Sequence, residues 1–154
     1  MLLENNVDFN STDNDDCVPL HYAALYGNLQ AVKFIWSNGS ALDVENKHGW
    51  QPIHFAAASD KPEVMNFLIE NDIFIDSLTE NNLTPLMISA QTNSTYTLNF
   101  LLDHGAEINK VNTENALIMA IKNNCINTGE ILINRGIDIN YQDSSKWTDR
   151  KSVV

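Results

Sequence analysis

The stretch that decides the fold is VPLHYAA at residues 18–24, which recurs as QPIHFAA at 51–57 and as TPLMISA at 84–90. These copies start 33 residues apart, and a fourth copy, NALIMAI at 115–121, follows after 31 residues. Self-similarity at a fixed period of about 20–50 residues is the sequence signature of stacked repeats. We therefore expect one domain built from repeated supersecondary units.

Each copy reads as the start of a short helix. Proline is favoured at the first helical position, because the N–H that it lacks would have no partner there. Pro19, Pro52 and Pro85 occupy this position. The helix should end at a residue type that tolerates the left-handed conformation. The residues at this place are Gly27, Asp60, Asn93 and Asn124.

A second apolar block keeps the same spacing and predicts a second helix in each copy. The block reads FIW at 34–36, FLI at 67–69, FLL at 100–102 and ILI at 131–133. We expect these residues in the core, with Trp36 as a packed core tryptophan rather than a ligand contact. The second helices should close at Gly39, Asp72, Gly105 and Gly136, each followed by a polar finger.

These motifs resemble the ankyrin repeat, whose signature is T-P-L-H-x-A at a period of about 33 residues. The resemblance implies an all-α solenoid of stacked helix-turn-helix units with β-hairpin fingers. The expected segments of this single domain are a partial repeat at 1–10, repeats at 11–43, 44–76, 77–109 and 110–140, and an abortive finger and tail at 141–154. The fourth repeat has a shortened finger, and in the tail Asp149-Arg150-Lys151 replaces Pro-Leu-His.

His21 and His54 take the histidine position of the signature, where the resemblance implies hydrogen bonds with the threonine and neighbouring backbone. The Thr/His pair is never complete here, because Val18 and Gln51 replace the threonine and Met87 replaces the histidine. No nucleophile or acid recurs beside the histidines. We therefore expect structural histidines bonded to backbone groups, with some stability lost at low pH.

Charge and cysteine content narrow the class of partner. The 154 residues include 9 Lys and Arg against 20 Asp and Glu, a formal charge of −11, which argues against nucleic acid or an anionic membrane and favours a basic partner surface. Cys17 and Cys125 form no CxxC motif and no Cys/His cluster, so neither a disulfide framework nor a metal site is expected. No apolar run approaches the ~20 residues of a membrane helix. A cytoplasmic location is expected, with the nucleus as the alternative.

The resemblance implies a non-catalytic module that binds another protein on a concave surface formed by fingertips and first helices. The sequence contains neither a phosphate-binding glycine loop nor clustered ligands, so no enzyme activity and no cofactor are expected. The alternative function is the recognition or regulatory portion of a larger enzyme or channel. The partner is an unidentified protein, and the chain is expected to be monomeric unless its incomplete end repeats associate.

Projecting the repeat onto the sequence gives candidate protein-binding residues. On the fingers they are Asn14, Asp15, Lys47, His48, Trp50, Glu80, Asn81, Leu83 and Trp147. Along the first helices they are Tyr26, Ser59, Gln91, Thr92, Lys122 and Asn123. Trp50 and Leu83 are large apolar residues that a polar turn does not require, and tryptophan is enriched among interface hot spots. The competing interpretation is that both pack against the next finger. The irregular fourth repeat is expected to cap the stack or to frame a groove.

Overall fold

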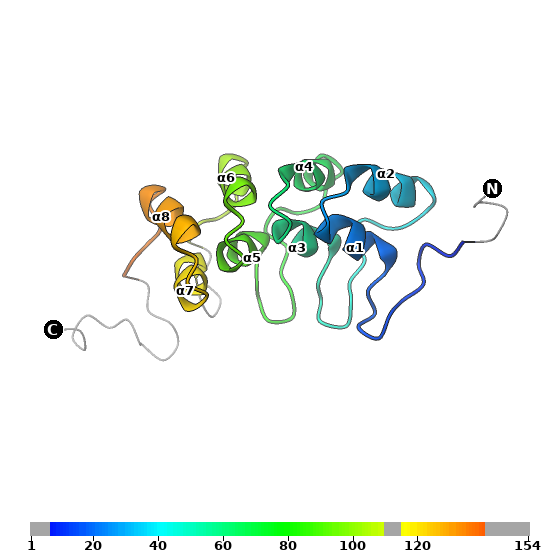
Figure 1. Ribbon diagram of the computed structural model, residues 1–154, viewed down its shortest axis with the longest axis horizontal. Coiled ribbons are helices and arrows are strands. Elements are labelled where there is room, and N and C mark those ends of the chain that lie inside the picture. The colour runs from blue at the N-terminus through cyan, green and yellow to red at the C-terminus, as the bar shows by residue number, and fades with distance from the viewer. Residues whose placement is uncertain (1–6, 110–114, 141–154) are drawn as a thin grey trace.

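The computed structural model describes residues 7–109 and 115–140, and these residues form eight helices and no β-strand. The helices alternate between two rows (Figure 1). The first row holds α1 (Pro19–Leu25), α3 (Pro52–Ala57), α5 (Pro85–Gln91) and α7 (Ala116–Lys122), and the second holds α2 (Leu29–Ser37), α4 (Pro62–Glu70), α6 (Thr95–Asp103) and α8 (Ile126–Asn134). The all-α solenoid of helix pairs is thus confirmed, while the boundaries of the repeats remain a prediction.

Left-handed residues follow the helices at the predicted places. After the first-row helices, φ is 63° at Gly27, 53° at Asp60, 57° at Asn93 and 56° at Asn124. After the second-row helices, φ is 100° at Gly39, 66° at Asp72, 88° at Gly105 and 89° at Gly136. Glycine has no Cβ to clash in this conformation, and Asn and Asp tolerate it better than other residues do. The turn residues therefore fix where each helix stops.

The core lies between the two rows and between successive helix pairs. In the first row, Ala24, Ala57 and Ala90 are completely buried, and their small side chains allow the next pair to approach closely. In the second row, the completely buried side chains at equivalent places are Val32, Met65 and Leu98. Because each pair buries its apolar face only against its neighbours, stability is distributed along the stack.

The prediction that Ile133 belongs to the core is wrong, because its side chain is 53% exposed. The same prediction is wrong for Phe34 and Trp36. Both lie on the outer side of α2 and are 46% and 42% exposed, whereas Ile35 between them is 8% exposed. Successive residues of an α-helix point about 100° apart, so three consecutive apolar residues cannot all face the core. Trp36 instead packs edge-to-face on Phe67, and Phe34 packs in the same way on Phe9, each with ring centroids 5.5 Å apart.

The fingers are narrow turns that project beneath the first row (Figure 1). The second finger is closed by a hydrogen bond from the Asn46 N–H to the Trp50 carbonyl oxygen at 3.0 Å. The third finger is closed by a hydrogen bond from the Thr79 N–H to the Leu83 carbonyl oxygen at 3.1 Å. Their tips turn at Gly49 and Asn82, where φ is 72° and 61°. The described residues show no β-ladder in the fingers. The shortened fourth finger and the tail finger fall within 110–114 and 141–154, outside the described residues.

Candidate functional site

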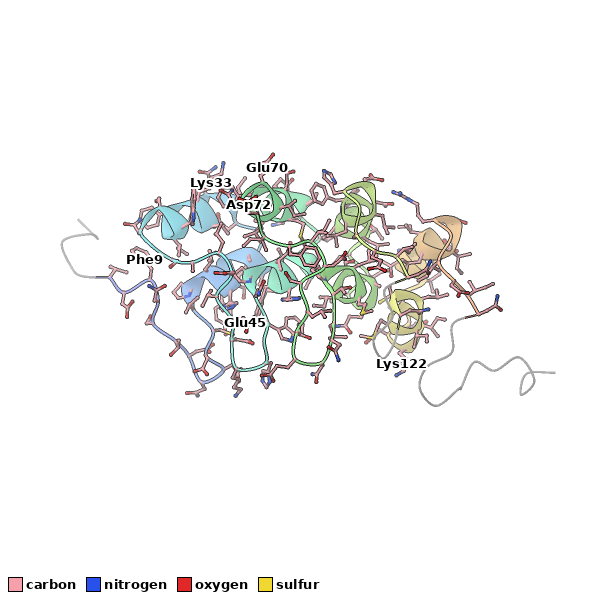
Figure 2. The ribbon with its side chains drawn as sticks, turned by 180° about the vertical axis from the view of Figure 1, so that it is seen from behind. Phe9, Lys33, Glu45, Glu70, Asp72 and Lys122 are labelled. Carbon is pink, nitrogen blue, oxygen red and sulfur yellow. The ribbon has the colours of Figure 1, made fainter. Side chains whose placement is uncertain are left out.

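The predicted contact residues that the structure describes belong to the fingers and to the ends of α1, α3, α5 and α7. We call the side of the stack made of the fingertips and the exposed sides of these helices the finger face. Figure 2 shows Glu45 and Lys122 on this side, while Lys33, Glu70 and Asp72 lie on the opposite side with α2 and α4. The opposite side carries the exposed aromatic residues of α2. The two sides therefore offer different surfaces to solvent.

The fingertips are tied to one another along the stack. The backbone N–H of Lys47 donates to the carbonyl oxygen of Asp15, and the backbone N–H of Glu80 donates to the carbonyl oxygen of His48, both at 3.1 Å. The Lys47 ammonium lies 2.5 Å from the Asp15 carboxylate and donates to the Asn14 carbonyl at 3.2 Å. The hydrogen bond to Asp15 raises the pKa of Lys47. An exposed ion pair adds little stability, so the backbone bonds between fingers are what align the tips.

Asp13 organises the first finger. Its Oδ1 accepts the backbone N–H groups of Asp15 and Cys17, both at 2.9 Å, and the Tyr22 hydroxyl donates to its other oxygen. The bond from Tyr22 is the main reason why the pKa of Asp13 lies below its ordinary value. The same bond raises the pKa of Tyr22 to about 12. The ring of Tyr22 is therefore held between α1 and the finger.

His21 joins the first helix to the second finger. Its Nδ1 accepts the Val18 N–H at 3.0 Å, and its Nε2 lies 3.0 Å from the carbonyl oxygens of both Val44 and Trp50. Because Nδ1 is an acceptor, the ring proton resides on Nε2 and is donated to the finger. Burial of the ring lowers the pKa of His21. The neutral ring is thus a cross-link between backbone segments.

His54 repeats this arrangement one helix pair later. Its Nδ1 accepts the Gln51 N–H at 2.9 Å, and its Nε2 lies 2.9 Å from the Ser77 carbonyl oxygen. Burial outweighs these hydrogen bonds and lowers the pKa of His54 to about 4. Both histidines bond backbone groups with both ring nitrogens, which confirms the prediction that they are structural.

Trp50 and Leu83 divide their surface between the interior and the finger face. The half-buried Trp50 ring packs on Phe55 edge-to-face, with centroids 5.5 Å apart, and lies 6.0 Å from the ring of His54. Leu83, at the equivalent place on the third finger, is also half-buried against the core. The indole of Trp50 packs on the helix that follows its own finger, so part of it supports the fold and part remains accessible.

The other candidates differ in how free their side chains are. The exposed residues at the fingertips are Asn14, Asp15, Lys47, His48, Glu80 and Asn81. Tyr26 is 71% exposed, and Thr92, Lys122 and Asn123 are also exposed, whereas Ser59 and Gln91 are half-buried. The side chains of Ser59, Thr92 and Asn123 donate hydrogen bonds to carbonyl groups of their own helices. Trp147 lies outside the described residues.

Sequence reasoning missed two aromatic residues beside Trp50. Tyr22 of α1 and Phe55 of α3 hold the same place in successive pairs, and their rings are 6.4 Å apart. We call these two residues, together with Trp50, which packs on Phe55, and Tyr26, which ends α1, the aromatic patch. Two aromatic residues 33 positions apart, directly after the two histidines, were the signal in the sequence.

Two features are absent from residues 7–109 and 115–140. No helix in these ranges is long and apolar enough to cross a membrane. No group of three or more His, Cys, Asp or Glu side chains in these ranges is placed to hold a metal ion.

Comparison with known proteins gives two matches. A family model described as ankyrin repeats (3 copies) matches residues 1–79 and 74–143. A putative ankyrin repeat protein of fowlpox virus (strain NVSL) is 56% identical over 32 residues, which are 21% of this chain and 23% of that protein. The match therefore spans less than a quarter of the viral protein's length.

Proposed function

Because the chain belongs to the ankyrin-repeat family, whose members are generally non-catalytic protein-interaction modules, we propose that it binds a partner protein on the finger face. It does so as a monomer in the cytoplasm, a reducing compartment that suits the free thiols of Cys17 and Cys125. The same surface serves as a recognition portion if the chain belongs to a larger enzyme or channel.

The observation that carries this proposal is the aromatic patch. Tyr22 is 40% exposed, and its ring lies 6.4 Å from that of Phe55, which packs on Trp50. Tyr26, four residues after Tyr22 at the end of α1, is 71% exposed. Tyrosine and tryptophan are enriched among residues that dominate binding energy, since they bury much area with few rotatable bonds. An exposed patch of this kind beside a polar rim is typical of a protein-binding surface.

The charges on the first two fingers favour a basic partner segment. Asp13, Asp15, Asp16 and Glu45 lie on the first two fingers, and Lys47 is already paired with Asp15. A Lys or Arg side chain of the partner can lie over an aromatic ring, a contact that contributes about 0.5–2 kcal/mol. Carboxylates beside the ring strengthen this preference by long-range attraction.

The hydrogen bonds between the fingers support a surface that is ready to bind. The Lys47 and Glu80 backbone bonds and the histidine links hold the tips in place before a partner arrives. A surface that is already ordered loses less conformational entropy on binding than a mobile loop does. The fold therefore favours recognition without a large rearrangement of the fingers.

The proposal is tested with peptides selected from a random displayed library against the full chain. Selected peptides should be enriched in Lys and Arg, and Tyr26→Ala should weaken their binding about tenfold or more. The matched control is Trp36→Ala, which removes an exposed aromatic residue from the opposite side and should leave affinity unchanged. Equal affinity of wild type and Tyr26→Ala, with loss in Trp36→Ala, would place the binding surface on α2 instead.

A further inference from the structure

The end of the stack at α7 and α8 differs from every internal junction between helix pairs. At the internal junctions, the first-row helices present completely buried alanines to the following pair. These alanines are Ala24, Ala57 and Ala90. At the equivalent place in α7 stands Ile121, which is 68% exposed. A large side chain therefore stands at the place where a regular neighbouring repeat packs closely against alanine.

Gly129 in α8 departs from the pattern in the opposite direction. The equivalent residues of the other second-row helices are large, apolar and completely buried. These residues are Val32, Met65 and Leu98. A Cβ atom on Gly129 would lie 3.9 Å from side-chain atoms of both Ala120 and Leu117, an ordinary contact distance. The helix thus has room for a side chain that the sequence does not supply.

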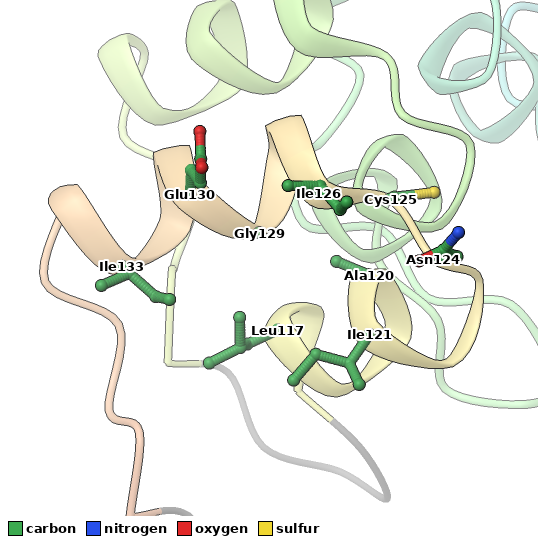
Figure 3. A pocket seen from close by; sticks show the side chains of 9 residues that line it. All are labelled: Leu117, Ala120, Ile121, Asn124, Cys125, Ile126, Gly129, Glu130 and Ile133. Carbon is green, nitrogen blue, oxygen red and sulfur yellow. The ribbon is translucent and has the colours of Figure 1, made fainter.

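An apolar pocket occupies the place of that missing side chain (Figure 3). Its volume is about 310 Å³, and Leu117 and Ala120 lie on the α7 side of it. Ile126 and Ile133, which are 63% and 53% exposed, flank it on α8. A pocket of this size accommodates one large aromatic side chain.

The internal junctions indicate which part of the chain covers such a face. In each of them, the residues that follow directly in sequence supply the covering helices. The residues that follow α8 include 141–154, where Arg150 and Lys151 fall at the places of Leu86 and Met87, which are 1% and 2% exposed. Burying two charges without partners is strongly unfavourable. The two charges at these places disfavour a buried helix and favour a single inserted side chain as the cover of this face.

We propose that residues 141–154 fold back on this end of the stack and that the Trp147 side chain fills the pocket. Trp147 lies seven positions beyond Asn140, a stretch that reaches up to about 25 Å, while α8, with nine residues, is only about 14 Å long. Trp147 is thus within reach of Ile133 and Gly129. The tether also gives the indole a high effective concentration at the pocket.

Charge complementarity supports the same occupant. Residues 141–154 carry three basic and two acidic side chains, whereas the rest of the chain carries six basic and eighteen acidic ones. Glu130 lines the pocket and is exposed. A basic segment that lies along an acidic stack gains long-range attraction, and Glu130 offers it a carboxylate beside the inserted ring.

Hydrogen exchange on the full chain tests the proposal directly. In Trp147→Ala, the amides of α7 and α8 should exchange roughly tenfold faster than in wild type. The reason is that the indole no longer buries apolar surface of these helices, so they open locally more often. Tyr141→Ala is the matched control, since it removes the other aromatic residue of the segment, and it should leave these rates unchanged. In a Gly129→Leu background, which fills the pocket, Trp147→Ala should have no further effect.

Fluorescence quenching gives a readout that does not depend on the pocket variant. The emission of Trp147, taken as the difference between wild type and Trp147→Phe, should be quenched by iodide several-fold less than that of free tryptophan. Quenching equal to that of free tryptophan, or identical exchange rates in wild type and Trp147→Ala, overturns the proposal. So does a concentration-dependent dimer that Gly129→Leu abolishes and Trp147→Ala preserves, because a second copy then occupies the pocket.

Discussion

The helices of the first row begin in two different ways, and the difference separates the two halves of the molecule. In the N-terminal half, the N–H groups of Val18 and Gln51 before α1 and α3 are bound by histidine rings that also reach the next finger. In the C-terminal half, Thr84 accepts the Met87 N–H at 3.2 Å, a bond within its own helix start.

Asn115 begins α7 in the same way as Thr84 begins α5. Its Oδ1 accepts the Ile118 N–H at 3.0 Å, and its Nδ2 makes a long contact of 3.4 Å with the Asp138 carbonyl. The histidine rings before α1 and α3 and the capping side chains before α5 and α7 all bind N–H groups at a helix start that have no partner inside the helix. Only the histidine version uses an ionisable group, so the two halves should respond differently to mutation and to pH.

The largest effect is expected from exchanging the two arrangements. His54→Met puts the residue type of α5 into α3 and leaves the Gln51 N–H and the Ser77 carbonyl without the ring. Each buried polar group left unpaired costs about 1–3 kcal/mol, so unfolding free energy should fall by about 3 kcal/mol.

The control for this exchange adds the missing cap. Gln51→Thr in the His54→Met background should recover about 1 kcal/mol, because threonine then caps α3 as Thr84 caps α5. Urea denaturation measures both changes. A loss of unfolding free energy below about 1 kcal/mol in His54→Met would show that the two arrangements are interchangeable. It would contradict the difference between the two halves of the molecule.

The next effect is the pH dependence of the N-terminal half. The pKa of His54 is lowered to about 4 in the folded chain, against an ordinary value of 6.5. The unfolded chain therefore binds a proton more readily, so this contribution is complete above about pH 6.5 and is lost as pH falls toward 4. Between pH 7 and pH 5 the loss should be about 2 kcal/mol.

Comparing wild type with His54→Met at the two pH values isolates this contribution from that of the carboxylates. The variant should lose about 2 kcal/mol less stability than wild type between pH 7 and pH 5. An equal loss in both proteins would mean that His54 accepts a proton without unfolding.

A smaller effect is expected at the start of α5. Thr84→Val removes the acceptor for the Met87 N–H at a site that is 1% exposed. Loss of an N-cap of this kind costs about 1 kcal/mol, and the loss should be the same at pH 7 and pH 5 because no titrating group takes part. Denaturation at both pH values checks it, and a loss confined to pH 5 would contradict the division between the halves.

The smallest effect on stability is expected at Tyr22, whose bond to Asp13 is exposed. Tyr22→Phe should leave the unfolding midpoint unchanged, since exposed polar pairs contribute little. The absorbance difference between wild type and Tyr22→Phe should instead show a phenol that ionises near pH 12, because Asp13 holds its proton. Ionisation near pH 10 would show that the bond does not persist in solution.

The sequence predicted those features that depend on one residue and its place in the period. Gly39, Asp72, Gly105 and Gly136 are left-handed as expected, because the conformation selects the residue type. The backbone role of the histidines was predicted as well, although their distant partners, such as Ser77, were not.

Features that depend on packing between helices escaped the sequence. The exposure of Trp36 follows from the direction of its side chain on α2, and the half-burial of Trp50 follows from the approach of Phe55. The sequence predicted that the irregular fourth repeat would cap the stack or frame a groove, but it did not indicate a pocket beside Gly129, which depends on how α7 and α8 pack together. The aromatic patch likewise joins residues of two helices and one finger.

The most direct test of the central claim is a hydrogen-exchange footprint of a selected Lys/Arg-rich peptide on the full chain. If the peptide binds the finger face, exchange should be slower at the backbone amides of the first two fingers, residues 13–17 and 46–50, and at the end of α1 near Tyr26. The amides of α2 and α4 should exchange as in the free protein. Protection confined to α2 and α4, with unchanged fingers, would contradict the claim.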